Sequence, residues 1–212
     1  MRYCTLAALL CLLMPTCMRS QDSDSIVMEI FRQKGLPFYE DNEVTLLPAG
    51  REKYDDLFQC VRGARRFIHM DYFKFQQDSI CRALFDILSD KAREGVEVRV
   101  VYDSFGNRYS NLPLRKSYLD SLRASGMQIV EFDRVRFPWI NHLWHRNHHK
   151  IAVIDGLYAY TGGMNVADYY LHGKPRVGTW RDMHMKVRGP MVAGYERVFE
   201  DMWWRAAKTR LD

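Results

Sequence analysis

Residues 148–165 read HHKIAVIDGLYAYTGGMN, and this stretch decides the fold. It contains two short apolar runs, 150–154 and 157–161, which are separated by Asp155 and Gly156. An Asp-Gly pair favours a tight turn between two strands. We therefore predict a β-hairpin here, and the segments on either side can be interpreted from it.

The remainder of the chain alternates between two patterns. Apolar residues recur at helical three- and four-residue spacing in 51–65, 78–94, 112–125 and 190–204. Strand-like apolar runs occupy 67–75, 96–102, 127–132 and 181–188. Gly95 and Gly126 follow two of the predicted helices, at the position where a left-handed residue ends a helix. This alternation predicts an α/β fold, a layered sheet flanked by helices.

Length and composition indicate one folded domain. The chain has 212 residues, of which 47% are hydrophobic and 27% charged, and its formal net charge is +5. These values exclude disordered and collagen-like classes, and the charge is a mild bias toward anionic partners. Residues 21–42 are polar and mixed, so we interpret them as a lead-in with at most one short helix. The domain itself is predicted to span 43–212.

The first twenty residues are typical of a targeting segment. Arg2 precedes an apolar run at 4–14, and no acidic residue occurs before Asp22. A spanning helix needs about 20 apolar residues, whereas a secretory signal needs about 7 to 15. We therefore expect residues 1–20 to be a signal peptide, or lipidation at Cys17 as the alternative. Either would place the protein at the cell membrane or its periplasmic face.

The segment between positions 134 and 150 contains no acidic residue but many cationic and neutral nitrogen donors. They are Arg134, Arg136, Arg146, Lys150, His142, His145, His148 and His149. Such donors suit a phosphate group, although a solvated basic loop is the simpler alternative. Zinc is a poorer fit, because the segment offers no carboxylate or thiolate ligand. With no G-x4-G-K-S/T loop either, we expect no metal and no other cofactor.

Aromatic and apolar residues are interspersed in the same segment: Phe137, Pro138, Trp139, Ile140, Leu143 and Trp144. Rings beside cations suit a lipid headgroup interface. The same residues could instead pack in the core or stack on nucleic-acid bases. Composition therefore favours a phospholipid partner and a membrane surface, and leaves the two other interpretations open.

His148 and Lys150 stand two residues apart at the start of an apolar strand, so their side chains are predicted to share one face. With Asp155 and the later glycine pair and Asn165, the order is H-x-K-x4-D-x6-G-G-x-N. This order resembles the signature of the phospholipase D superfamily. Its length makes a chance match improbable.

Flanking residues make the chain similar to the first catalytic half of a bacterial cardiolipin synthase. These stretches are 95–100 (GVEVRV), 102–103 (YD), 146–151 (RNHHKI), 161–165 (TGGMN), 180–184 (WRDMH) and 189–190 (GP). One departure is Gly163, where many superfamily members have serine. The resemblance, which covers about 42–204, implies a phospholipase D-like fold in which this chain is one motif-bearing half of a pseudo-twofold pair.

The residue types also make chemical sense on their own. A neutral imidazole can attack a phosphodiester phosphorus, so His148 is the candidate nucleophile. The ammonium of Lys150 and the amide of Asn165 can hold the phosphate oxygens. A carboxylate on the far ring nitrogen would set the imidazole tautomer, and the resemblance assigns this role to Asp182. We interpret Asp155, the other carboxylate of the catalytic signature, as an orienting residue of the turn.

Three further residues complete the predicted site. Gly162 and Gly163 let the backbone approach a ligand closely, and Arg146 adds a second cation. All three are predicted to bind the substrate.

One copy of the signature supplies only half of the required chemistry. The departing alkoxide needs a proton, which His148 cannot give while it bonds to phosphorus. The resemblance implies a histidine from a second copy, yet His69 and His172 lack a lysine two residues on. His184 does precede Lys186, but no downstream Asp or G-x-x-N follows, so we interpret it as strand packing. A homodimer or a second motif-bearing half would be needed.

The resemblance implies phosphatidyl transfer through a phosphohistidine intermediate. Phosphatidylglycerol would be converted to cardiolipin and glycerol, or water would resolve the intermediate as in phospholipase D hydrolysis. Two alternatives remain open. One is a metal-independent homodimeric endonuclease, and the other is an inactive membrane-binding half of a two-motif enzyme.

Overall fold

The computed structural model describes residues 20–134, 138 and 144–211. Contacts divide the chain into two units, with the boundary between Glu40 and Asp41. The predicted targeting segment, including Cys17, lies outside the described residues except at position 20. The first unit contains helix α1 (Ser20–Gln33). None of the helices in the described part of the chain combines the length and apolar character needed to cross a bilayer.

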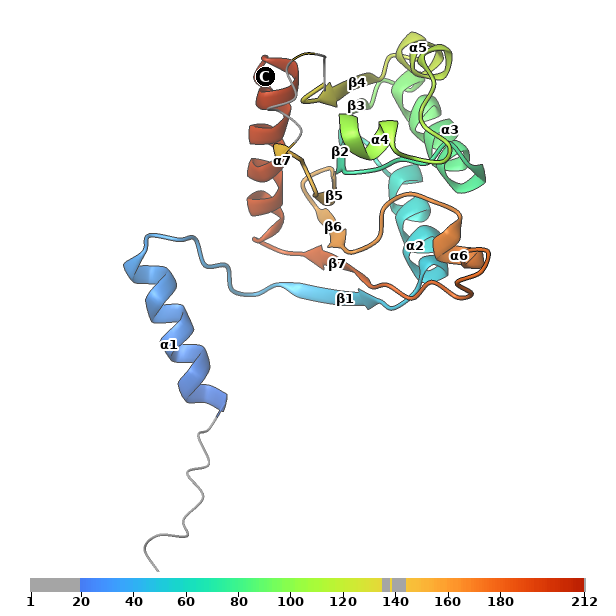
Figure 1. Cartoon of the computed structure of the whole chain (residues 1–212). Coiled ribbons are helices and arrows are strands. Elements are labelled where there is room, and N and C mark those ends of the chain that lie inside the picture. Colours follow the sequence, from blue (N-terminus) through green and yellow to red (C-terminus); the bar gives the residue numbers. More distant parts are fainter. Residues whose placement is uncertain (1–19, 135–137, 139–143, 212) are drawn as a thin grey trace, which may run out of the picture. The chain divides into compact units, whose positions relative to one another are not determined.

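The second unit is built on a mixed seven-stranded sheet, shown in Figure 1. Its strands are β1 (Glu43–Leu47), β2 (Phe67–Tyr72), β3 (Glu97–Asp103), β4 (Gln128–Phe132), β5 (Lys150–Ile154), β6 (Tyr158–Gly162) and β7 (His184–Arg188). They are ordered β1-β7-β6-β5-β2-β3-β4. The β2-β3-β4 part is parallel, and every other pair is antiparallel. The sheet therefore joins a helix-linked half to a hairpin-linked half.

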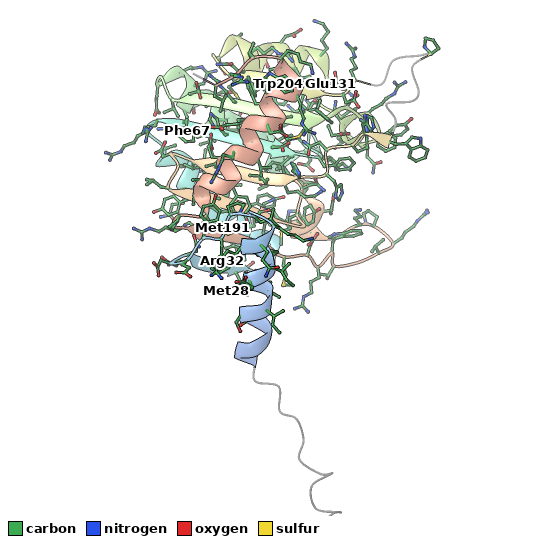
Figure 2. All side chains as sticks on the ribbon, turned by 90° about the vertical axis from the view of Figure 1, so that its left-hand side faces the viewer. Met28, Arg32, Phe67, Glu131, Met191 and Trp204 are labelled. Carbon is green, nitrogen blue, oxygen red and sulfur yellow. The ribbon has the colours of Figure 1, made fainter. Side chains whose placement is uncertain are left out.

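Helices cover both faces of this sheet. They are α2 (Gly50–Arg62), α3 (Ser79–Arg93), α4 (Ser104–Arg108), α5 (Lys116–Ala124), α6 (Tyr169–His172) and α7 (Val192–Ala207). Figure 1 shows α7 on one side of the sheet and α2, α3 and α5 on the other. Figure 2 shows α7 extending from near Met191 to Trp204, the end close to Glu131. The predicted α/β layered sheet flanked by helices is confirmed.

The predicted hairpin is confirmed as β5 and β6. Residues 151–154 pair with 158–161 in antiparallel register. Asp155 and Gly156 have φ values of 55° and 69°, and two left-handed residues are what a type I′ turn requires. Gly95 and Gly126 also have positive φ, 91° and 99°, which confirms their expected place just after a helix.

Several elements differ from the sequence prediction. The helix predicted at 112–125 begins only at Lys116, because Pro113 disfavours helical geometry at the residue before it. The strand predicted at 181–188 begins at His184, since the residues before it form part of the site described below. Strand β1 was not predicted; it is a sheet edge in which only Leu47 is buried, so its sequence carries no clear strand pattern.

A buried histidine with two glutamate partners attaches α7 to the sheet. The imidazole of His69 on β2 is buried, with Nδ1 2.6 Å from Glu196 on α7 and Nε2 2.8 Å from Glu97 on β3. The rings of Phe67 and Phe199 stack on its two faces, each at 4.5 Å between centroids. One histidine thus joins two strands and a helix.

Replacing His69 by leucine should destabilise the fold. The change keeps apolar packing between the two phenylalanine rings but leaves the carboxylate of Glu196 largely buried without its partner. Loss of one partner of such a pair costs on the order of 3 kcal/mol in the free energy of unfolding. Urea unfolding measures this cost, with the exposed His172→Leu as the control. A loss no larger than that of the control would show that the histidine and its glutamate partners do not stabilise the domain.

Candidate functional site

Four strand ends meet at one edge of the sheet. Tyr72, the last residue of β2, pairs with Lys150, the first of β5. Gly162, the last residue of β6, pairs with His184, the first of β7. The antiparallel order β7-β6-β5-β2 therefore brings the residues before β5, after β6 and before β7 to the same edge, as the predicted signature requires.

His148 is exposed at this edge. Its ring lies 4.8 Å from the ring of Phe73, at an interplanar angle of 59°. Partial burial lowers the pKa of His148 below its usual value, and the nearby Lys150 lowers it further, which outweighs the opposing effect of Asp103. At neutral pH the imidazole is therefore mainly uncharged, which is the form that can attack phosphorus.

Lys150 is 5% exposed, and its Nζ donates a hydrogen bond to the carbonyl oxygen of His148 at 2.8 Å. The ammonium also lies 5.3 Å from the centroid of the Phe73 ring. Burial lowers the pKa of Lys150 to about 8, although Asp182 and Asp71 act to raise it. The group is thus a cation at neutral pH that is close to losing its proton.

Two fully buried carboxylates hold the backbone next to His148. Asp71, on β2, accepts hydrogen bonds from the side chain of Asn147 and from Nδ1 of His149, the latter at 2.9 Å. Asp103, at the end of β3, accepts one from the backbone N–H of Asn147 at 2.9 Å. His149 therefore contacts Asp71. Neither aspartate was predicted to belong to the site, although an acidic residue inside an apolar strand was a visible signal.

Arg146, predicted to bind substrate, has carboxylate partners within the protein. Its Nη1 lies 3.2 Å from Asp103 and its Nη2 3.1 Å from Asp133. The guanidinium thus anchors the segment before β5 to the end of β3. Arg146 also lines the groove beside His148, and its predicted contact with substrate stays a prediction.

The glycine pair allows β7 to approach the loop after β6. Gly162 has φ of +150°, and a Cβ there would lie 2.6 Å from the Cα of His184. A Cβ at Gly163 would overlap the carboxylate of Asp182. This overlap gives a physical reason for glycine where many superfamily members have serine: any side chain here would displace Asp182.

Asp182 lies beside cations rather than beside His148. Its carboxylate accepts a hydrogen bond from the backbone N–H of Met183 at 2.8 Å, and it acts to raise the pKa of both Lys150 and Lys53. Within the described residues no hydrogen bond joins it to His148. In this structure its electrostatic partners are the two ammonium groups.

Asn165 is 8% exposed in the loop after β6. Its backbone N–H donates to the hydroxyl of Tyr170 at 3.0 Å, and its Nδ2 lies 3.5 Å from the same oxygen. Its Oδ1 has no hydrogen-bond partner in the described part of the chain. The carboxamide is therefore buried at the edge with bonding capacity unused.

Sequence reasoning missed two buried residues at this edge. Lys53, on α2, is fully buried and donates to the carbonyl oxygens of Met164 and Asn165. His184 is 2% exposed, and neither of its ring nitrogens has a partner among the described residues. Burial lowers the pKa of His184 strongly, and the two lysines lower it further, so it is uncharged. The signal for Lys53 was its position four residues before Leu57, on the apolar face of a predicted helix.

Asp155 does not belong to the site, which corrects its place in the catalytic set. It follows the last residue of β5, at the opposite end of the strand from Lys150. Its carboxylate accepts the backbone N–H groups of residues 65, 66 and 67 at 2.8 to 3.0 Å. Partial burial acts to raise the pKa of Asp155, but these donors outweigh it and hold the pKa below its usual value. These bonds lie at the turn, and the role of Asp155 as an orienting residue there stays a prediction.

A groove with a volume of about 900 Å³ adjoins His148. It extends from the end of β4 to the last turns of α7, and its described lining includes Arg134, Arg205 and Lys208 as well as Trp144. The predicted aromatic segment lies mostly outside the described residues. Among the described residues, no three His, Cys, Asp or Glu side chains form a group that could hold a metal ion.

The comparisons with known proteins identify the family. A family model described as the phospholipase D-like domain of cardiolipin synthase matches residues 57–203. The chain therefore belongs to the phospholipase D-like family of cardiolipin synthase domains. This confirms the resemblance that the signature and its flanking residues indicated.

Curated relatives include cardiolipin synthase of Alkalihalophilus pseudofirmus, 38% identical over 79% of this chain and 33% of its own length. The major cardiolipin synthase ClsA of Bacillus subtilis is 35% identical over 88% of this chain and 38% of its own. Cardiolipin synthase A of Pseudomonas syringae is 39% identical over 82% of this chain and 36% of its own length. The chain thus spans about a third of the length of these relatives.

Solved structures share the fold at low identity. NucT from Helicobacter pylori has a TM-score of 0.59 at 15% identity, covering 78% of this chain and 98% of that chain. Nuc from Salmonella typhimurium, a phospholipase D family member, has a TM-score of 0.57 at 16% identity, covering 78% and 97%. Phosphatidylserine synthase from Haemophilus influenzae has a TM-score of 0.55 at 18% identity, covering 76% of this chain and 36% of that chain.

Anion binding at this edge should weaken as the pH rises. The ammonium of Lys150 is charged below its pKa of about 8 and neutral above it. We expect the affinity for tungstate, a dianion across this range, to fall between pH 7 and pH 9. Isothermal titration calorimetry measures the affinity, and Lys150→Arg is the matched variant, because a guanidinium keeps its charge. A wild-type profile as flat as that of the variant would contradict the assignment.

Proposed function

We propose that this chain supplies one half-site of a phosphatidyltransferase that acts on phosphatidylglycerol through a phosphohistidine on His148. The observation that carries the proposal is an exposed, uncharged imidazole beside the buried ammonium of Lys150. Asn165 lies in the loop after the neighbouring strand, with an amide available to an anion. A nucleophile next to positive charge suits attack on a phosphodiester.

The proposed reaction has two displacements. In the first, a ring nitrogen of His148 bonds to phosphorus, and the bond from phosphorus to the headgroup glycerol oxygen breaks; glycerol leaves after taking a proton. In the second, a hydroxyl of another phosphatidylglycerol loses its proton and attacks phosphorus. The phosphorus–nitrogen bond breaks and cardiolipin forms. If water replaces that hydroxyl, the product is phosphatidic acid.

A second half-site must provide the proton for the leaving glycerol. His148 is occupied as the nucleophile, and His184 is uncharged and buried, so neither can act as that acid. Relatives about three times as long leave room for a second motif-bearing half. Two copies of this chain are the other arrangement that could supply it; the NucT and Nuc chains are almost completely covered by the same fold.

The rim of the site favours a lipid surface over a soluble diester. The loop 173–181 carries three cations and no acidic residue, and exposes Val177 at 62%. Backbone hydrogen bonds of 2.9 Å in both directions close its tip between Lys174 and Gly178. The Lys174 ammonium is 3.7 Å from the centroid of the Trp180 ring. A firmly held basic loop with an apolar tip suits an anionic bilayer, so we propose action at the membrane.

The proposed function is tested with purified chain and vesicles of phosphatidylglycerol. Wild type should form cardiolipin, detected by mass spectrometry, and His148→Asn should reduce the rate at least about 1000-fold, because no covalent adduct can form. His172→Asn, an exposed histidine outside the site, serves as the control. Fractions are separated by native mass beforehand, since we expect activity in a two-chain assembly only.

Three other results would contradict the proposed function or its covalent mechanism. Nicking of plasmid DNA in the presence of a chelator, lost in His148→Asn, would favour the endonuclease alternative. Vesicle binding without either activity in a two-chain assembly would favour an inactive half. An enzyme quenched at alkaline pH, where a phosphohistidine survives, should carry the phosphatidyl group; its absence in an active assembly would exclude the covalent mechanism.

Membrane docking through the loop 173–181 is tested by Val177→Asp. The added charge should weaken binding to phosphatidylglycerol vesicles several-fold, because it removes apolar contact and repels the anionic surface. Leu157→Asp is the matched control: this leucine is 59% exposed, close to the 62% of Val177, at the turn between β5 and β6. Vesicle co-sedimentation measures binding. Equal losses in the two variants would contradict a specific role for the loop.

A further inference from the structure

A buried lysine lies beneath the loop that follows β6. The Nζ of Lys53 donates hydrogen bonds to the carbonyl oxygens of Met164 at 2.9 Å and Asn165 at 3.0 Å. It also lies 5.0 and 5.1 Å from the ring centroids of Tyr54 and Tyr72. In the described part of the chain this ammonium forms no ion pair with a carboxylate. Peptide carbonyls and aromatic rings therefore hold a fully buried charge.

Such an arrangement is costly for the fold alone. An ammonium loses its hydration when it is buried. Without an ion pair, little Coulombic attraction offsets this desolvation cost. Burial lowers the pKa of Lys53 well below its usual value; Asp182 opposes this shift and Lys150 adds to it. A methionine would fill similar space without a charge to desolvate. The lysine is thus better explained by what it bonds than by packing.

Both of its acceptors belong to the backbone around Asn165. The carbonyls of Met164 and Asn165 stand on either side of the Asn165 Cα. The neighbouring Tyr54 binds the same stretch of backbone. Its hydroxyl donates a hydrogen bond to the Asn165 carbonyl at 3.0 Å and accepts one from the N–H of Ala167 at 3.1 Å. Two adjacent residues of α2 thus fix the peptides from 164 to 167.

The side chain of Asn165 has only its two tyrosine neighbours to orient it. Its Nδ2 lies 3.5 Å from the Tyr170 hydroxyl, a weak contact, and its side chain also interacts with the Tyr169 hydroxyl, while its Oδ1 has no partner among the described residues. The direction of the carboxamide therefore depends on the backbone that carries it. That backbone is held by Lys53 and Tyr54.

We propose that Lys53 is a positioning residue, whose buried ammonium holds the loop after β6 so that the carboxamide of Asn165 faces the phosphate site. Lys53 itself does not contact the substrate; it acts through Asn165. The inference rests on the proposed function only in taking Asn165 as a ligand of the phosphate oxygens.

The test is a double-mutant cycle on the full chain with Lys53→Met and Asn165→Ala. Tungstate affinity is measured by calorimetry, so that no lipid activity is needed. Each single variant should bind about 10-fold more weakly. In the Asn165→Ala background, Lys53→Met should cost no more than about 2-fold, because residues that act as a unit are not additive. Circular dichroism and urea unfolding confirm that each variant is folded.

A kinetic readout separates positioning from packing, because a folded variant with a misplaced Asn165 loses contacts to the developing charge more than it loses substrate binding. If lipid transfer is also active, kcat should fall more than KM rises.

Tyr54→Phe provides a second route that keeps the lysine and the core packing. Like Lys53→Met, it should weaken tungstate binding. The loss of affinity should again be small in the Asn165→Ala background. Tyr160→Phe is the matched control, because that buried tyrosine contacts Asp56 through its hydroxyl, away from the site. If Lys53→Met fails to fold, the cycle of Tyr54→Phe with Asn165→Ala tests the inference in its place.

Two results would overturn the inference. One is unchanged tungstate affinity in a folded Lys53→Met variant. The other is additive losses across the cycle, since Lys53 would then act independently of Asn165. A preserved coupling without any transfer to phosphatidylglycerol would instead reject the proposed function and leave the positioning role intact.

Discussion

Two carboxylates with no solvent exposure, Asp71 and Asp103, set the geometry on which the edge depends. They accept the side chain and the backbone N–H of Asn147, immediately before His148. A buried carboxylate must have its oxygens satisfied, so the segment that supplies those donors has little freedom to move. His148, the proposed nucleophile, is therefore carried on backbone that the centre of the sheet holds in place.

The charge balance at this edge follows from burial. Burial lowers the pKa of both Lys53 and Lys150, and Asp182 is the carboxylate that opposes both shifts. The same environment keeps His148 and His184 uncharged. The ammonium of Lys150 beside the uncharged imidazole of His148 favours an incoming phosphate anion. The closeness of Asp182 depends on Gly163, because a side chain there would occupy the carboxylate's position.

Much of the fold could be predicted because its signals are local. Asp155 and Gly156 specify a turn through their own φ angles, and Gly95 and Gly126 end helices for the same reason. Strand β1 could not be predicted in this way, since it is defined by its pairing with β7 and buries little of its own surface. The start of β7 was also misplaced, because the residues before it alternate plausibly but adopt the conformation of the site.

The sequence by itself determined the family and the α/β class, and it predicted His148, Lys150 and Asn165 as site residues, because their order and spacing are readable along one strand and its turn. Only the tertiary structure decided which other side chains join them. Lys53 and Asn165 are separated by more than a hundred positions and meet through one hydrogen bond, whereas Asp155, inside the signature, lies at the far end of its strand. Proximity across a sheet edge depends on strand order and register, which no local pattern encodes.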